Sequence, residues 1–156
     1  MSATPPGQTD AGRPEPVEPI ELVEETSAEP AVVWRILTEP ADVARWFAEV
    51  TPVDGIGSPY RIDFGDGSLI DGTVREWVPG QRLAYTWRWK DEEPPQTTLV
   101  TWVVEATPSG GSLIRLRHDG WADAGADVAT RDEHEGYWAD YFVALGDLLD
   151  EEAGAS

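Results

Sequence analysis

Two histidines carry most of the chemistry that this sequence can offer. His118 and His134 are the only histidines, and the chain has no cysteine. Because an imidazole titrates near neutral pH, the pair could bind a polar ligand group or move a proton. Alternatively, each is a structural residue that hydrogen-bonds at the end of its own helix or strand. Both interpretations stay open, and no residue is predicted to be catalytic.

Other kinds of site chemistry have little support in the sequence. Without cysteine there are no thiolate nucleophiles, disulfides or cysteine-ligated zinc sites. No metal is expected, because the histidines and nearby Asp119, Asp123 and Glu133 match no metal-binding spacing. Glycines at 65, 67, 110 and 111 suit hairpin turns rather than phosphate loops, so no cofactor is expected. Turn chemistry and solvated strand faces account for a group of acidic residues: Asp63, Asp66, Asp71 and Glu76.

The charge of the chain limits its partners. Its 156 residues include 30 acidic and 11 basic side chains, for a net charge of -19. Nucleic acids and anionic membranes are recognised through Lys and Arg, so neither is an expected partner. Three arginines, Arg88, Arg115 and Arg117, alternate onto the solvent side of predicted strands. There they either pair with surplus acid or form a docking face for an acidic partner.

The location and assembly of the protein are predicted from broader features. No stretch approaches 18 consecutive apolar residues. Residues 1–19 contain five prolines and no apolar run, which is typical of a disordered tail and not of a signal peptide. We therefore expect a cytoplasmic protein, monomeric or homodimeric, with one domain at residues 20–152 and a short tail at residues 153–156.

A long amphipathic segment organises the predicted fold. Its apolar residues recur at the spacing of one helical face and predict a helix over Thr130–Glu152. Thr130 is expected to cap this helix, with Glu133 reaching back to it. The helix would be roughly 30 Å long. Its apolar stripe consists of Trp138, Tyr141, Phe142, Leu145, Leu148 and Leu149.

The rest of the domain is predicted to form an antiparallel sheet. Pro30 and Pro40 open two short helices after a first strand at 20–26. Alternating apolar and polar residues between turns then predict strands at 60–64, 69–77, 82–90, 97–106 and 113–118. We predict an α+β fold in which about six to seven antiparallel strands wrap around the long helix. Since a curved sheet cannot follow a straight helix along its full length, a cavity is expected between them.

Aromatic side chains crowd the predicted cavity. They either fill the core or, because Tyr and Trp carry polar tips, contact a flat and partly oxygenated hydrophobic molecule. The residues predicted to contact a ligand are Tyr60, Tyr85, Trp87, Trp102, His118, Trp121, His134, Tyr137, Trp138 and Tyr141.

The order of elements and several short motifs resemble a known family. The motifs are Ala28–Trp34 (AEPAVVW), Leu37–Pro40 (LTEP), Arg45–Phe47 (RWF), Gly72–Glu76 (GTVRE), Leu83–Trp87 (LAYTW), Gly110–Trp121 (GGSLIRLRHDGW) and Glu133–Tyr137 (EHEGY). In the last of these, Tyr137 stands where the family usually has Trp. Over residues 20–152 the chain is similar to the START-like helix-grip superfamily. Within it, the chain resembles the family named for homologues of the activator of the ninety-kilodalton heat-shock protein ATPase.

The resemblance implies several alternative functions rather than a single one. Such folds bind lipids and polyketides, act as cyclases, or serve as co-chaperones. The leading expectation is binding of a small hydrophobic molecule, aromatic, polyketide-like or lipid-like, between helix and sheet. One alternative is a cyclase or dehydratase in which His118 or His134 shuttles a proton. The other is a regulator that docks on a chaperone ATPase in a stress response.

Overall fold

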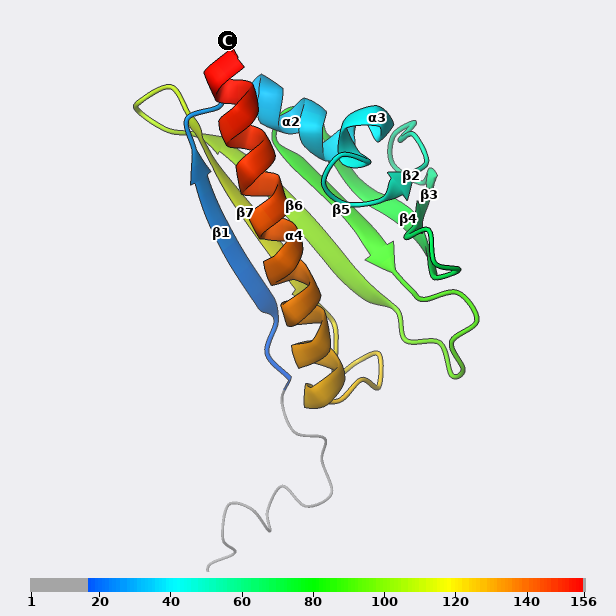
Figure 1. The fold of residues 1–156 in the computed structure, drawn as a ribbon. Helices are drawn as coiled ribbons and strands as arrows, with labels where there is room; N and C mark the ends of the chain where they lie inside the picture. The colour runs from blue at the N-terminus through cyan, green and yellow to red at the C-terminus, as the bar shows by residue number, and fades with distance from the viewer. Residues whose placement is uncertain (1–16, 156) are drawn as a thin grey trace, which may run out of the picture.

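The computed structural model describes residues 17–155 of the chain. These residues form a single antiparallel sheet that grips a long C-terminal helix (Figure 1). The elements follow one another as β1 (Ile20–Thr26), α2 (Pro30–Thr38), α3 (Pro40–Val43), β2 (Glu49–Val50), β3 (Pro59–Asp63), β4 (Leu69–Val78), β5 (Arg82–Trp87), β6 (Thr98–Ala106), β7 (Ser112–Asp119) and α4 (Val128–Ala155).

The sheet has seven strands in the order β1-β7-β6-β5-β4-β3-β2. Strands β2 to β7 form a continuous meander, and β1 pairs with β7 so that Leu22 lies opposite Leu116. Every strand pair is antiparallel. Helix α4 crosses one face of the sheet beside β1, while α2 and α3 lie near its C-terminal half (Figure 1). The predicted α+β helix-grip fold is confirmed.

Strand β7 shows how alternation places residues on the two faces. Ile114, Leu116 and His118 are buried under α4. The residues between them face solvent, where Arg115 pairs with Glu105 and Arg117 pairs with Glu21 and Asp119 (each N–O distance 2.9 Å). Exposed pairs of this kind each contribute at most about 1 kcal/mol. The arginines therefore neutralise nearby acidic side chains on the outer face of the sheet.

Helix α4 buries the stripe that the sequence predicts but starts at a different residue. Trp138, Leu145 and Leu149 are almost fully buried. The Thr130 N–H donates to the Asp127 carboxylate (2.9 Å), so Asp127 is the capping residue. The prediction that Thr130 caps the helix is wrong, because the first turn, which holds Val128 and Ala129, is exposed and does not belong to the buried stripe.

Both ends of α4 are attached to the rest of the domain. The guanidinium of Arg131 donates to the backbone oxygens of Glu18 and Pro19 (3.0 Å each). This part of the expected N-terminal tail is thus bound to the helix, and residues 1–16 lie outside the described residues. At the other end, Glu152 pairs with Arg35 of α2. The helix then continues through Ala155, across residues where we expected a tail.

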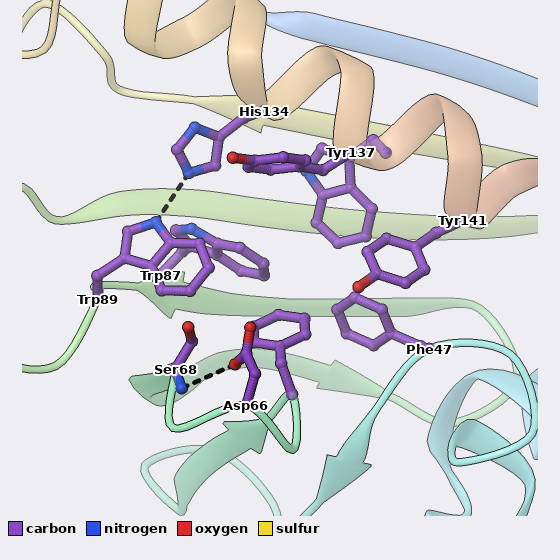
Figure 2. A pocket seen from close by; sticks show the side chains of 10 residues that line it. Phe47, Asp66, Ser68, Trp87, Trp89, His134, Tyr137 and Tyr141 are labelled. Carbon is purple, nitrogen blue, oxygen red and sulfur yellow. Dashed lines mark hydrogen bonds between the residues drawn. The ribbon is translucent and has the colours of Figure 1, made fainter.

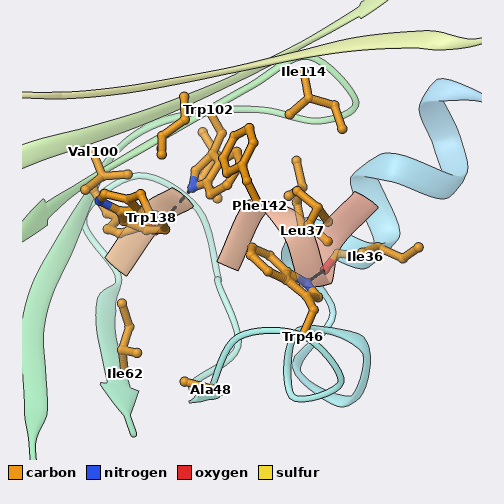
Figure 3. Close-up of a cluster of buried hydrophobic side chains, with 14 of the residues drawn as sticks. Ile36, Leu37, Trp46, Ala48, Ile62, Val100, Trp102, Ile114, Trp138 and Phe142 are labelled. Atoms are coloured by element: carbon orange, nitrogen blue, oxygen red, sulfur yellow. Dashed lines mark hydrogen bonds between the residues drawn. The ribbon is translucent and has the colours of Figure 1, made fainter. Parts of the chain in front are cut away.

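The core lies between α4, the sheet and the two short helices (Figure 3). The Trp102 ring on β6 stacks on Phe142 of α4, with ring centroids 5.7 Å apart and an interplanar angle of 9°. Trp46, which follows α3, packs edge-on against Trp102 and donates its indole N–H to the Ile36 carbonyl (2.9 Å). Large rings thus fill this end of the space between helix and sheet.

Among the helices of residues 17–155, none combines the length and the hydrophobicity that a membrane span requires.

Candidate ligand-binding site

A pocket of about 300 Å³ opens between the N-terminal half of α4 and the part of the sheet formed by β3, β4 and β5 (Figure 2). Its walls come from α4, from the end of β5, from the turn between β3 and β4, and from the segment after α3. Ten side chains line it: Phe47, Phe64, Asp66, Ser68, Trp87, Trp89, His134, Tyr137, Trp138 and Tyr141. Here the predicted separation of sheet and helix leaves real space.

Local periodicity explains why two of these walls are aromatic. On α4, four lining residues occur at positions i, i+3, i+4 and i+7 from His134, which places them along one stripe of the helix. Trp87 and Trp89 are two residues apart, and side chains at that spacing point to the same face of an extended chain. Strand β5 ends at Trp87, and Trp89 continues the extended run through a bridge to Ile70.

The rings in the pocket are packed against one another. The Phe47 and Tyr141 centroids are 4.7 Å apart in an edge-to-face arrangement. Trp89 lies 5.5 Å from Phe64 and 5.7 Å from Trp87. These spacings are those of favourable aromatic pairs. The rings of the pocket therefore contact one another, except for the half-exposed Tyr137, whose ring contacts only His134 among the described residues.

His134 lines the pocket with both of its ring nitrogens engaged. The indole N–H of Trp89 donates to Nε2 (2.9 Å), and Nδ1 lies 2.8 Å from the Thr130 carbonyl (Figure 2). Since an indole nitrogen can only donate, Nε2 is the acceptor and Nδ1 carries the proton. Burial lowers the pKa of His134, against smaller raising effects of the Thr130 carbonyl and of the Glu133 and Glu92 carboxylates. The ring is a neutral acceptor.

His118 is completely buried beneath the pocket and does not line it. Its Nδ1 accepts from the Trp138 indole (3.0 Å), and its Nε2 lies 2.7 Å from the Thr98 hydroxyl. That hydroxyl can in turn donate to the Trp87 carbonyl (3.3 Å). Burial first, and the nearby His134 second, lower the pKa of His118 well below its usual value. The prediction that His118 contacts a ligand in the pocket is corrected, because the end of β7 lies beneath the rings of Trp87 and Trp138.

The other predicted contact residues divide between pocket and core. Trp87, Tyr137, Trp138 and Tyr141 line the pocket with His134. The remaining four aromatic residues are each 2% exposed and lie in the core outside the pocket lining: Tyr60, Tyr85, Trp102 and Trp121. Burial raises the pKa of Tyr60 and Tyr85, so both phenols are neutral. The indole of Trp102 donates to the Tyr85 hydroxyl (3.2 Å), and that of Trp121 donates to the His118 carbonyl (2.9 Å).

Five lining residues were absent from the predicted contact set: Phe47, Phe64, Asp66, Ser68 and Trp89. Alternation with Trp87 already placed Trp89 on the correct face, so that signal was available. From the sequence, Asp66 is expected to serve the β3–β4 turn alone. Its Oδ1 does accept the Ser68 N–H (2.9 Å), but the same turn also forms a wall of the pocket.

Two buried polar atoms lack a partner within the described residues. They are the indole nitrogen of Trp87, whose ring lines the pocket, and one carboxylate oxygen of Glu92. Buried polar atoms are normally paired, and an unpaired one costs about 1–3 kcal/mol. Within residues 17–155 no group of three or more His, Cys, Asp or Glu side chains could hold a metal ion.

A curved antiparallel sheet gripping a long C-terminal helix, with an aromatic pocket between them, defines a helix-grip domain. The family described as "Activator of Hsp90 ATPase homolog 1-like protein" matches residues 27–150, and the chain belongs to this family. The resemblance inferred from the sequence motifs is therefore confirmed. No curated protein matches the chain.

Solved structures agree on the fold. Protein MLL2253 from Mesorhizobium loti superposes with a TM-score of 0.77 at 24% identity, over 86% of this chain and 98% of its own. The Aha1 dimer from Colwellia psychrerythraea superposes with a TM-score of 0.72 at 18% identity, over 86% of this chain and 97% of its own. DynU16, a protein in the dynemicin biosynthetic locus, gives 0.76 at 23% identity, over 86% of this chain and 48% of its own length.

Proposed function

We propose that this protein binds a small, hydrophobic, ring-containing molecule in the pocket between α4 and the sheet. The observation that carries the proposal is the pocket of about 300 Å³ itself, open and walled by mutually packed aromatic rings. A volume of this size and lining is typical of small-molecule sites. The aromatic lining and the modest volume favour an aromatic or polyketide-like ligand over a long-chain lipid.

The histidines favour binding over catalysis. A general base must reach the proton that it removes, with a free lone pair. The Nε2 lone pair of His134 already accepts from Trp89, and His118 is sealed in the core. A cyclase or dehydratase that used either imidazole would first have to break a hydrogen bond that is partly buried at His134 and fully buried at His118. Turnover therefore receives less support from this geometry than retention of a ligand does.

Two wider expectations remain separate proposals. The family name suggests docking on a chaperone ATPase, and a pull-down that recovers no chaperone would contradict it. The Colwellia psychrerythraea protein is a dimer, which suggests a homodimer here as well, and sedimentation of the purified protein as a monomer would contradict that. Neither partner is needed for the pocket to form. A cytoplasmic location also stays a prediction.

A neutral fluorescent dye tests the proposed binding. N-phenyl-1-naphthylamine brightens in apolar surroundings and carries no charge. At about 0.3 kcal/mol per non-hydrogen atom, a ligand of roughly 17 such atoms gains about 5 kcal/mol, which corresponds to a Kd of about 0.2 mM or tighter. We expect saturable brightening with one site per chain.

Matched variants locate the bound dye. Ser68→Phe adds a ring inside the pocket and is expected to abolish saturable binding. Val143→Phe adds the same ring on the exposed side of α4, where Val143 is 66% exposed, and is expected to leave binding unchanged. Lack of saturable binding by the unmodified protein, or equal binding by both variants, would contradict the proposal.

A further inference from the structure

The walls of the pocket are mostly aromatic ring faces. Seven of the ten lining side chains are Phe, Trp or Tyr, whose ring faces carry partial negative charge. The imidazole of His134 is neutral and presents no free donor, since its Nδ1 proton is bound by the Thr130 carbonyl. No Lys or Arg lines the pocket. An anionic ligand would find no positive group there.

The one charged lining residue is an acid, Asp66. The Ser68 N–H binds one of its carboxylate oxygens and lowers the pKa of Asp66, which keeps the side chain ionised. Figure 2 shows Asp66 and Ser68 extending from the turn toward the rings on the opposite wall. Within residues 17–155, Asp66 forms no ion pair. Arg61, the arginine of β3, is paired with Asp71 (3.1 Å).

Rings and a carboxylate around one space form a site for a positive charge. Ammonium groups are attracted to the faces of Trp, Tyr and Phe, and aromatic cages use this attraction to recognise quaternary ammonium ligands. The attraction is stronger for a cation that is buried among the rings, whereas the Asp66 side chain is itself exposed to solvent. The net charge of -19 also raises the local concentration of cations and speeds their association.

We propose that the ligand of this pocket is an organic cation, a hydrophobic amine or quaternary ammonium compound. Its apolar body lies among the rings, and its cationic group lies against Asp66 and the aromatic faces. This inference rests on the proposed function, because it names the chemical class that the same pocket selects. Hydrophobic carboxylates and phosphates are expected to bind more weakly, because they would meet Asp66 with no compensating cation.

Displacement of the neutral dye compares two probes of nearly equal shape. Benzyltrimethylammonium carries a permanent charge, and neopentylbenzene is its uncharged carbon analogue. We expect the cation to displace the dye at a concentration at least about tenfold lower than neopentylbenzene does. Phenylacetate, the anionic probe, is expected to displace it least of the three.

Two single-charge variants test the role of the carboxylate. Asp66→Asn keeps an oxygen to accept the Ser68 N–H and removes the charge, so it is expected to weaken binding of the cation about three- to tenfold more than binding of the neutral probe. Asp147→Asn removes one charge from an exposed position outside the pocket lining and is expected to change neither probe.

The outcomes separate this inference from the proposed function. Equal displacement by the cation and its carbon analogue, or an equal loss for both probes in Asp66→Asn, would overturn the organic-cation assignment while dye binding stands. A stronger effect of phenylacetate would overturn it as well. If the dye itself does not bind, the proposed function fails first, and the cation assignment fails with it.

Discussion

Acidification is predicted to destabilise the protein through His118. In the fold this imidazole is fully buried, and its neutral form already satisfies both nitrogens, with Trp138 donating to Nδ1 and Thr98 accepting from Nε2. A second proton would have to lie on Nδ1, facing the indole N–H. Burial accordingly lowers the pKa of His118 well below its usual value. In the unfolded chain the same side chain has a pKa of about 6.5.

The sign and size of the effect follow from this difference. Below pH 6.5 the unfolded chain binds a proton at His118 that the folded protein does not, so the free energy of unfolding falls as pH falls. The contribution of neutral His118 to the free energy of unfolding is fully present above pH 6.5. It is lost progressively as the pH drops from there toward the pKa of His118 in the folded protein. Between about pH 6.5 and 5.5 the loss is about 1 kcal/mol from this residue. Burial of His134 acts in the same direction.

Urea unfolding followed by tryptophan fluorescence at the two pH values measures the loss. His118→Gln is the matched control, because a glutamine amide offers one acceptor for Trp138 and one donor for Thr98 without titrating. All carboxylates remain in both proteins, so the difference in pH dependence isolates the imidazole. We expect the variant to lose about 1 kcal/mol less than the unmodified protein. Equal pH dependence, or an NMR titration that places the pKa of His118 near 6.5, would refute the argument.

The remaining predictions concern other buried contacts. Trp138→Phe leaves a buried acceptor of His118 unpaired, whereas Trp87→Phe removes an N–H that has no partner, so the first should lower the free energy of unfolding by about 1–3 kcal/mol more; equal losses in urea would contradict this. Gly136→Ala, in α4 with open space around the new methyl group, should stabilise by about 1 kcal/mol. Gly72→Ala would press its methyl group into a backbone carbonyl of β5 and should therefore lower the Tm. An unchanged or raised Tm would contradict this.

Most of the fold could be predicted from local patterns in the sequence. The alternation around Leu83 and Tyr85 and the helical stripe around Trp138 and Leu145 each predict an element and the face that it buries. Boundaries were less predictable. The cap at Asp127 could not be predicted from the buried stripe, because the helix begins with an exposed turn whose residues lie outside that stripe.

The site was only partly predictable. The α4 residues of the pocket follow from one helical stripe, and Trp89 follows from its alternation with Trp87. The sequence also placed Trp102 and Trp121 among the ligand contacts, although both lie in the core. Alternation tells which face of a strand a residue occupies, but not how far the helix stands from that face.

The sequence by itself determined the elements, the buried face of each one and the aromatic character of the interior, because these depend on residue types and on spacings of two or of about 3.6 residues. Only the tertiary structure decided where α4 and the sheet separate, and therefore which rings enclose a pocket and which close the core. It also brought Asp66 opposite α4 and gave each histidine its indole partner, as Trp89 donates to His134 across 45 positions of the chain. Such contacts depend on the curvature of the whole sheet, which no single segment specifies.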